Sequence, residues 1–151
     1  MKISKSSAWD QGRIFSFLSE NTIPVRLAVI QDKHPLICSV WFSVDAETLE
    51  ISCVSHGKSE LVKSLMADPR VGFEIALNDP PYKGVRGKGN AKLTQENVSN
   101  SLQEVIVRFL GSTNSNLARW LLGRAEEEYV IKITPSWITS WDYSERMSMV
   151  S

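Results

Sequence analysis

Short β-type segments separated by turn residues constrain the fold of this chain more than any other feature. The pattern predicts strands over residues 25–31, 36–44, 49–55, 71–77, 84–93, 129–134 and 137–143. Helical patterns interrupt these strands over residues 8–19, from Ser59 to Ala67, between Thr94 and Gly111, and over residues 117–122. Because this order lacks a regular βαβ alternation, we expect an α+β protein, mainly β, built on an antiparallel barrel.

Polar residues predict where two of these helices begin. Ser7 followed by Asp10 is similar to a capping box, which predicts a first helix starting at about Ala8. Thr94 is the predicted cap of the third helix, which carries its apolar residues on one face and stops at Gly111.

The bulk composition limits the classes of partner. The chain has 151 residues with 42% hydrophobic and 23% charged residues, and its 17 basic and 17 acidic residues cancel. We therefore expect one globular domain over residues 1–151, with an N-terminal helix within 1–22 and the barrel over 24–143. The balanced charge argues against nucleic-acid or membrane-surface partners that depend on bulk charge.

Targeting and cysteine signals predict a cytoplasmic protein. No apolar run approaches the roughly 20 residues needed to cross a bilayer, and the first twelve residues contain no apolar signal core. Cys38 and Cys53 form no CxxC pair and have no metal-ligand spacing, so we expect reduced thiols and no metal site.

The stretch over residues 51–69 predicts an anion site, because a strand passes through the turn HGKS into an amphipathic helix. Free N–H groups and the helix dipole attract anions, and Lys58 and Ser59 add a charge and a donor that suit phosphate. Two alternatives stay open: Ser59 is only the helix cap with Lys58 solvated, and His56 either donates to an anion or supports the turn. A P-loop is excluded, because the position five residues before Gly57 is Ser52 rather than glycine.

Three further segments hold candidate site residues. Arg26 lies in an apolar strand and needs a partner, either a phosphate or a salt bridge. Arg86 lies in a strand with two internal glycines, which indicate a bend or the close approach of another backbone or a flat ligand, and Arg86 itself either faces solvent or borders an anionic ligand. Trp137 and Trp141 share one face of the last strand, which favours a dimer interface or, for Trp141, stacking on a cofactor ring.

Together these segments resemble the pyridoxamine 5′-phosphate oxidase-like, flavin-binding split-barrel family. The matching pieces are residues 24–29, 35 with 39–42, 59 with 65–71, 82–86 with 89–91, and 135–142. Each piece is weak alone, but their order covers most of the chain from Pro24 to Asp142.

The resemblance implies a six-stranded antiparallel split β-barrel with flanking helices, a homodimer, and FMN between the subunits. By position, Arg26 and Ser59 match phosphate contacts, Val40 and Trp41 match the strand along the isoalloxazine ring, and Trp141 borders the ring. The full set of expected cofactor-binding residues is Arg26, Val40, Trp41, Ser55, His56, Lys58, Ser59, Arg86 and Trp141.

Two departures from the family pattern limit the activity. Glu60-Leu61 replaces an Arg-Lys pair after the serine, where Lys58 is the substitute charge, and residues 142–146 lack the arginine-x-histidine of the true oxidases. The resemblance therefore implies an FMN-dependent oxidoreductase acting on an unknown small molecule, but not on pyridoxamine phosphate, with no catalytic residue identified. The alternatives are a non-catalytic carrier or sensor of flavin, deazaflavin or haem, and a dimeric scaffold without cofactor.

Overall fold

One eight-stranded sheet organises the computed structural model, which describes residues 1–149. Its strands are β1 (Lys2–Ile3), β2 (Val25–Gln31), β3 (His34–Val40), β4 (Phe42–Val44), β5 (Ile51–His56), β6 (Arg70–Ala76), β7 (Lys83–Thr94) and β8 (Glu128–Asp142). The helices are α1 (Gln11–Glu20), α2 (Glu60–Ala67), α3 (Val98–Leu110), α4 (Asn116–Leu122), the 3₁₀ turn η1 (Ala125–Glu127) and α5 (Ser144–Ser148). The strand order is β3-β2-β6-β7-β8-β5-β4, and β1 pairs with β8.

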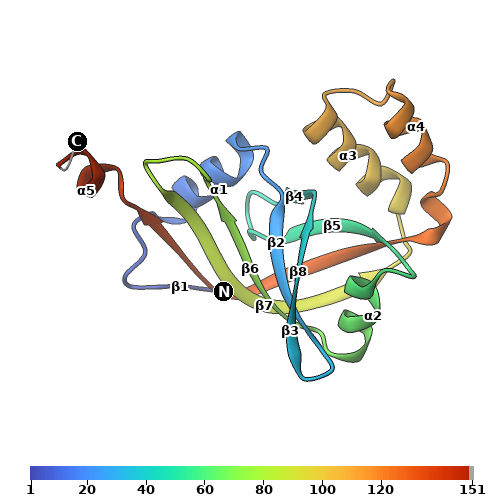
Figure 1. The fold of residues 1–151 in the computed structure, drawn as a ribbon, viewed down its shortest axis with the longest axis horizontal. Helices are drawn as coiled ribbons and strands as arrows, with labels where there is room; N and C mark the ends of the chain where they lie inside the picture. Colours follow the sequence, from blue (N-terminus) through green and yellow to red (C-terminus); the bar gives the residue numbers. More distant parts are fainter. Residues whose placement is uncertain (150–151) are drawn as a thin grey trace.

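The sheet curls into a barrel because its two edge strands follow each other in the chain. β3 and β4 lie at opposite ends of the strand order, yet only Trp41 separates them. Counted as one strand broken at Trp41, they make six main strands with β2 and β5–β8, and every pairing among these is antiparallel. The expected six-stranded antiparallel split barrel is therefore confirmed, and its curvature is visible in Figure 1.

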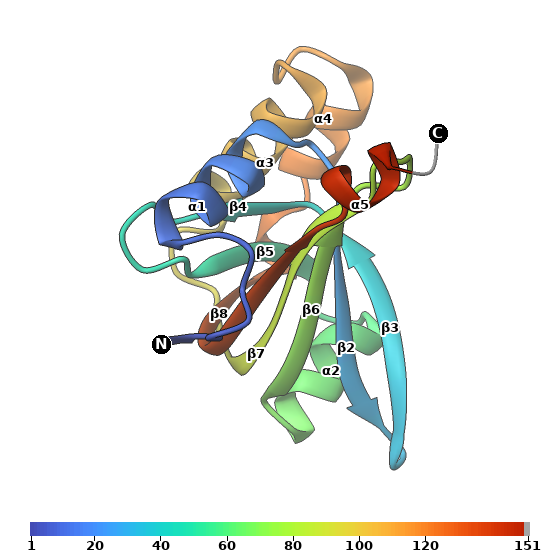
Figure 2. The same cartoon turned by 90° about the vertical axis from the view of Figure 1, so that its left-hand side faces the viewer.

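Alternating side chains fill the barrel. On β2, Val25, Leu27 and Val29 are fully buried, as are Ile51 and Ile131 on β5 and β8. Burial of such side chains stabilises the fold by about 1.5–3 kcal/mol each. In Figure 2, α1 lies at one end of the barrel and α2 at the other.

A second hydrophobic cluster lies outside the barrel, where α3, α4 and η1 cover the outer face of β5 and β8. Val105, Ile106, Ala118 and Val130 are buried there. Arg108 ties α3 to α1, because its guanidinium donates to the carbonyl oxygens of residues 18 and 21 and lies 4.7 Å from the Phe42 ring centroid. Burial lowers the pKa of this arginine.

Two predicted helix caps were wrong. The α1 cap is Asp10, whose Oδ1 accepts from Arg13 N at 2.9 Å, whereas Ser7 Oγ bonds Ser140 Oγ at 2.8 Å and so anchors the N-terminal segment to β8. The α3 cap is Asn97, in the left-handed region at φ 55°, because β7 continues as far as Thr94 in its pairing with β8.

Three predicted strands also have different limits. The strand expected over 36–44 is broken at Trp41, and the two strands expected over 129–134 and 137–143 are one strand, β8. The pairing of β7 with β8 shifts register between Lys88 and Gly89, which pair with Trp137 and Pro135 and leave Ser136 without a partner in the ladder. The two strands pair regularly before and after this irregularity.

Glycines allow β6, β7 and β8 to approach closely at this bend. A Cβ placed on Gly87 would lie 2.4 Å from the Phe73 ring, and one on Gly89 would lie 2.1 Å from the Thr134 carbonyl oxygen. The structure thus contains the predicted bend and the predicted close approach of another backbone at these glycines.

We expect Gly89→Ala to lower the free energy of unfolding by at least about 2 kcal/mol, because its Cβ collides with backbone that cannot turn away. Gly12→Ala is the matched control, because its Cβ would lie no closer than 3.7 Å to any neighbour and alanine favours a helix. Urea unfolding of both variants measures the difference, and equal stabilities would contradict this account of the bend.

Candidate functional site

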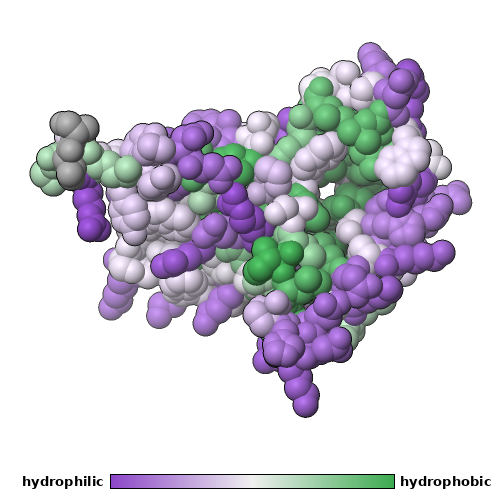
Figure 3. Space-filling view, in the orientation of Figure 1, coloured by the Kyte–Doolittle hydropathy of each residue, from purple (hydrophilic) through white to green (hydrophobic). Residues whose placement is uncertain are grey.

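A groove of about 350 Å³ lies between the β3–β4 break and the helices α3 and α4. Its walls are mostly apolar and come from β3, β5, β8, α3 and α4, with Pro24 and Trp41 from the connecting segments. The lining residues are Pro24, Ser39, Val40, Trp41, Val54, Leu102, Val105, Leu117, Leu121 and Glu128. Figure 3 shows hydrophobic side chains gathered on α3 and α4 beside a hollow. We call this the ring groove.

Trp41 gives the ring groove an aromatic wall. Its indole stacks on Phe109 of α3, with ring centroids 5.4 Å apart and planes 12° apart, which fixes the indole plane. The predicted pair Val40 and Trp41 is therefore brought together in one groove, on a wall that suits a flat aromatic ligand.

Glu128 is the acidic residue of the ring groove, and the sequence analysis missed it. Its side chain is only 7% exposed and its Oε1 lies 3.1 Å from Arg124 Nε. Along β8, Tyr129 and Ile131 pack toward the barrel core, so Glu128 and Val130 face the helices instead. The only signal for Glu128 in the sequence is that it lies two residues before Val130 and so shares its face of the strand. Because Glu128 is the last of three consecutive glutamates, the sequence does not single it out.

Most polar side chains of the turn before α2 form hydrogen bonds to neighbouring residues of the chain. Ser59 Oγ accepts from Val62 N at 3.1 Å and lies 3.0 Å from Ser55 Oγ, so the helix-cap interpretation of Ser59 is confirmed. His56 Nδ1 accepts from Lys58 N at 3.0 Å, so its Nε2 carries the hydrogen that is donated to Glu127 Oε2 at 2.7 Å. His56 thus supports the turn, whereas the Lys58 ammonium forms no ion pair with residues 1–149.

This turn continues the wall of the ring groove. Val54 lines the groove and is followed directly by Ser55, and His56 pairs across the sheet with Glu128. Ser55 and His56 are therefore the last residues of the strand that borders the groove, and Lys58 and Ser59 follow it, although none of the four lines the groove.

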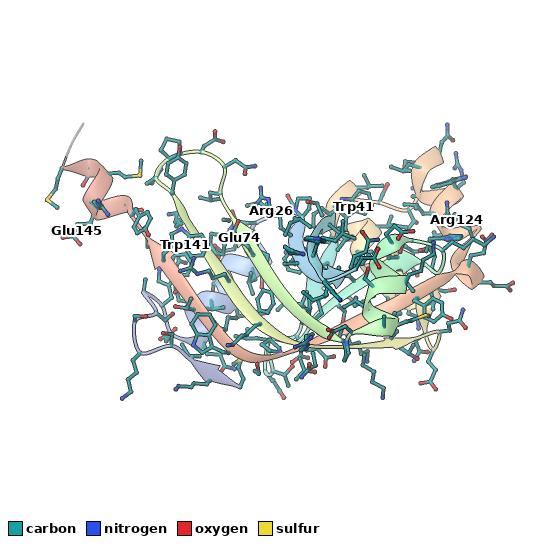
Figure 4. The ribbon with its side chains drawn as sticks, turned by 60° about the horizontal axis from the view of Figure 1, so that its bottom comes forward. Arg26, Trp41, Glu74, Arg124, Trp141 and Glu145 are labelled. Carbon is teal, nitrogen blue, oxygen red and sulfur yellow. The ribbon has the colours of Figure 1, made fainter. Side chains whose placement is uncertain are left out.

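The predicted residues Arg26 and Arg86 line a separate hollow of about 480 Å³ on the outer face of β2, β6, β7 and β8, and Trp141 does not line it. We call it the concave face; Arg26, Ile37, Glu74, Arg86, Lys88 and Trp137 line it. Figure 4 shows Arg26 beside Glu74, with Trp141 toward the α5 end of the sheet and Trp41 and Arg124 toward the opposite end.

Arg26 has protein partners on this concave face. Its side chain is 34% exposed, its Nη2 donates to Asn78 Oδ1 at 2.7 Å, and its Nη1 lies 3.6 Å from Glu74 Oε1. The salt-bridge interpretation of Arg26 is therefore present in the structure. Its cross-strand partner Ser39 lines the ring groove, so the two hollows meet across the β2–β3 pair without a shared lining residue.

Arg86 and Trp141 also contact each other, with the guanidinium carbon 5.5 Å from the indole centroid. A Cβ on Gly84 would lie 2.7 Å from Trp141 Cζ2, so the indole packs directly on the backbone of β7. Within one chain, the predicted residues thus form three groups. Val40 and Trp41 lie in the ring groove, Ser55, His56, Lys58 and Ser59 lie at the turn before α2, and Arg26, Arg86 and Trp141 lie on the side of the concave face. Arg26 and Ser59 therefore do not share a groove. No three His, Cys, Asp or Glu side chains within residues 1–149 converge on a metal position.

The comparison with solved structures identifies the fold. The conserved hypothetical protein Rv2991 from Mycobacterium tuberculosis superposes with a TM-score of 0.79 at 22% identity, covering 97% of this chain and 93% of that one. An F420 reductase gives 0.68 at 17% identity (82% and 94% covered), and a "Putative Pyridoxamine 5'-phosphate oxidase" from Listeria innocua gives 0.66 at 19% (86% and 96% covered). The chain therefore has the pyridoxamine 5′-phosphate oxidase-like split-barrel fold.

The sequence comparisons add no closer relative. No protein-family model matches the chain, and no curated protein matches it significantly. No helix among residues 1–149 is long and apolar enough to span a membrane.

The His56–Glu127 pair predicts a pH dependence of stability. The hydrogen bond from His56 lowers the pKa of Glu127 below its ordinary 4.5, so its contribution is present above pH 4.5 and is lost as the pH falls through the folded-state value. Between pH 7 and pH 3, we expect the unfolding free energy to decline less steeply in Glu127→Gln than in the wild type. Urea titrations at each pH measure it, with Glu126→Gln as the neighbouring control. Parallel curves for wild type and Glu127→Gln would refute this role.

Proposed function

We propose that this protein is a flavin-dependent oxidoreductase that holds the cofactor ring in the ring groove and the cofactor phosphate at the turn before α2. One observation carries the proposal: an apolar groove with a fixed indole wall borders β5, the strand that leads through a turn to the N-terminus of α2. The fold that this chain shares with an F420 reductase and with the "Putative Pyridoxamine 5'-phosphate oxidase" from Listeria innocua supports it.

The residues present fit such a cofactor. A volume of about 350 Å³ lies within the range of about 300–1,000 Å³ found for ligand pockets, and apolar walls with few polar groups suit a planar ring. At the turn, the ammonium of Lys58, which forms no ion pair with residues 1–149, and the N-terminus of α2 suit a phosphate. When bound, the flavin supplies the hydride chemistry, while Trp41 orients the ring and α3 and α4 shield it from water.

Flavin fits better than haem. Both ring nitrogens of His56 are bonded, to Lys58 N and to Glu127, so this histidine is committed to the turn rather than free as an axial ligand. FMN is our choice among flavins, because it ends in a single phosphate, and a deazaflavin is the second candidate. Residues 142–146 lack the arginine-x-histidine of the true oxidases, so the substrate we propose is a small molecule other than pyridoxamine phosphate.

We further propose that two copies pair through the concave face. Ile37 is 61% exposed there, between the cations Arg26, Arg86 and Lys88 and the anion Glu74. A second copy would cover this apolar and charged surface and bring its own residues to the point where the two hollows meet. A cytoplasmic location is part of the same proposal, because Cys38 and Cys53 are both free thiols.

Ser59→Asp tests the phosphate site without removing the helix cap. Aspartate caps helices as well as serine does, so we expect the unfolding free energy to change by less than about 0.5 kcal/mol. Two like charges about 4 Å apart near a surface repel by roughly 4 kcal/mol before screening, so we expect FMN affinity to fall at least about tenfold. Riboflavin, which has no phosphate, should bind both proteins equally.

Ser115→Asp is the matched control, because Ser115 caps α4 by the same bond, from Ala118 N to Oγ at 3.1 Å. Flavin fluorescence titration measures both ligands. Unchanged FMN affinity in Ser59→Asp would overturn the phosphate site, and a wild-type protein that binds no flavin would overturn the proposed function.

Ile37→Asp tests the pairing of two copies. The substitution removes the exposed apolar contact and puts a hydrated carboxylate in its place, which must lose its water on pairing, so we expect the dimer to dissociate. Ile30→Asp is the control, since Ile30 is exposed on the same hairpin but does not line the concave face. Light scattering after gel filtration measures the mass, and a wild-type monomer or a dimeric Ile37→Asp variant would contradict the proposal.

A further inference from the structure

Glu128 is an unusual residue for the wall of an apolar groove. Eight of the ten residues that line the ring groove are apolar, and the others are Ser39 and Glu128. A charged side chain that is only 7% exposed is rare unless it is paired or serves a ligand. Arg124 provides one partner, but it engages a single oxygen.

The ion pair leaves part of the carboxylate available. Arg124 Nε lies 3.1 Å from Glu128 Oε1, and its N–H does not point along that contact, so the pair is Coulombic rather than hydrogen-bonded. The second oxygen, Oε2, forms no hydrogen bond with residues 1–149. It is not sealed in the interior either, because the described residues contain no buried side-chain oxygen without a partner. Oε2 is therefore accessible from outside, and Glu128 borders two hollows, the ring groove and a polar pocket between η1 and the start of α3.

Arg124 is held in a way that fixes the carboxylate. Its guanidinium carbon lies 4.4 Å from the centroid of the Trp120 ring, and both residues belong to the α4–η1 segment that covers β8. Figure 4 shows Arg124 at the α4 end of the molecule. Glu128 is itself anchored in the β5–β8 ladder opposite His56. Its acceptor is thus positioned by a regular strand and a stacked cation, as a recognition group requires.

We propose that Glu128 recognises the imide N–H on the pyrimidine edge of the bound ring, an inference that rests on the proposed function. Flavins and deazaflavins both carry this N–H between two carbonyl groups, and it is the donor that a carboxylate in an otherwise apolar groove can accept. A hydrogen bond to a charged acceptor contributes more than a neutral one, which makes Glu128 the residue that orients the ring within the groove. Haem lacks such an N–H, so this contact selects for flavin-type rings.

The test compares FMN with N3-methyl-FMN, which cannot donate from the imide, on wild type, Glu128→Leu and Glu128→Gln. We expect wild type to bind FMN at least about tenfold more tightly than the methylated analogue, and Glu128→Leu to lose that preference. Glu128→Gln keeps an acceptor oxygen and should retain most of the preference. Its bound FMN should have a more positive midpoint potential, because a negative charge beside the ring opposes electron uptake.

Glu126→Leu is the matched control, because Glu126 lies on η1 and lines the polar pocket that Glu128 also borders, but not the ring groove. It should leave both affinities and the potential unchanged, and urea unfolding identifies any variant that fails to fold. If Glu128→Leu folds and still discriminates between the two ligands, the inference is wrong while the flavin site stands. If wild type binds neither FMN nor F420, the proposed function itself fails and the inference falls with it.

Discussion

The close approach of β6, β7 and β8 is the constraint on which the rest of this structure depends. Gly84, Gly87 and Gly89 leave no room for a Cβ, so three strands bend together around the Phe73 ring and the Pro135 irregularity. That bend makes one side of the sheet concave and lets its far ends curl toward each other. The concave face lies at this bend, with Phe73 and Gly87 in its lining.

The closure of the barrel then determines where a ligand can bind. Because the chain changes from one sheet edge to the other at Trp41, this residue leaves the strand pairing and its indole becomes part of a wall. Helices α3 and α4 build their hydrophobic cluster beside it, and Arg108 ties that cluster to α1. The ring groove is thus the junction of two cores rather than a hole in one of them.

Local signals predicted much of this fold. The strand β2 has the bounds expected from its apolar run, and Ser59 caps α2 as its spacing indicates, because both features depend on neighbouring residues. The break at Trp41 and the partners of Arg26 depend on strands distant in sequence, which periodicity does not encode. The resemblance identified the right fold, but the importance of Glu128 emerges only when α4 covers the start of β8.

The candidate site also divides into residues that neighbours in the chain bring together and residues that distant strands bring together. Val40 with Trp41, and Ser55 with His56, Lys58 and Ser59, are adjacent in the chain, so their grouping could be predicted. Arg26 and Trp141 were assigned to the same cofactor by position in the family, yet Arg26 lines another hollow and Trp141 packs beside Arg86, which also lines it. Side-chain direction follows from strand pleat and pairing, and a one-residue difference in either reverses it.

Pro35 has a consequence for how copies of this chain can associate. It lies in β3, an edge strand whose outer backbone would otherwise offer a template for another strand. Proline has no N–H to offer, so it interrupts that template and discourages sheet extension from molecule to molecule. An open-ended fibril built by adding strands along this edge is thereby disfavoured.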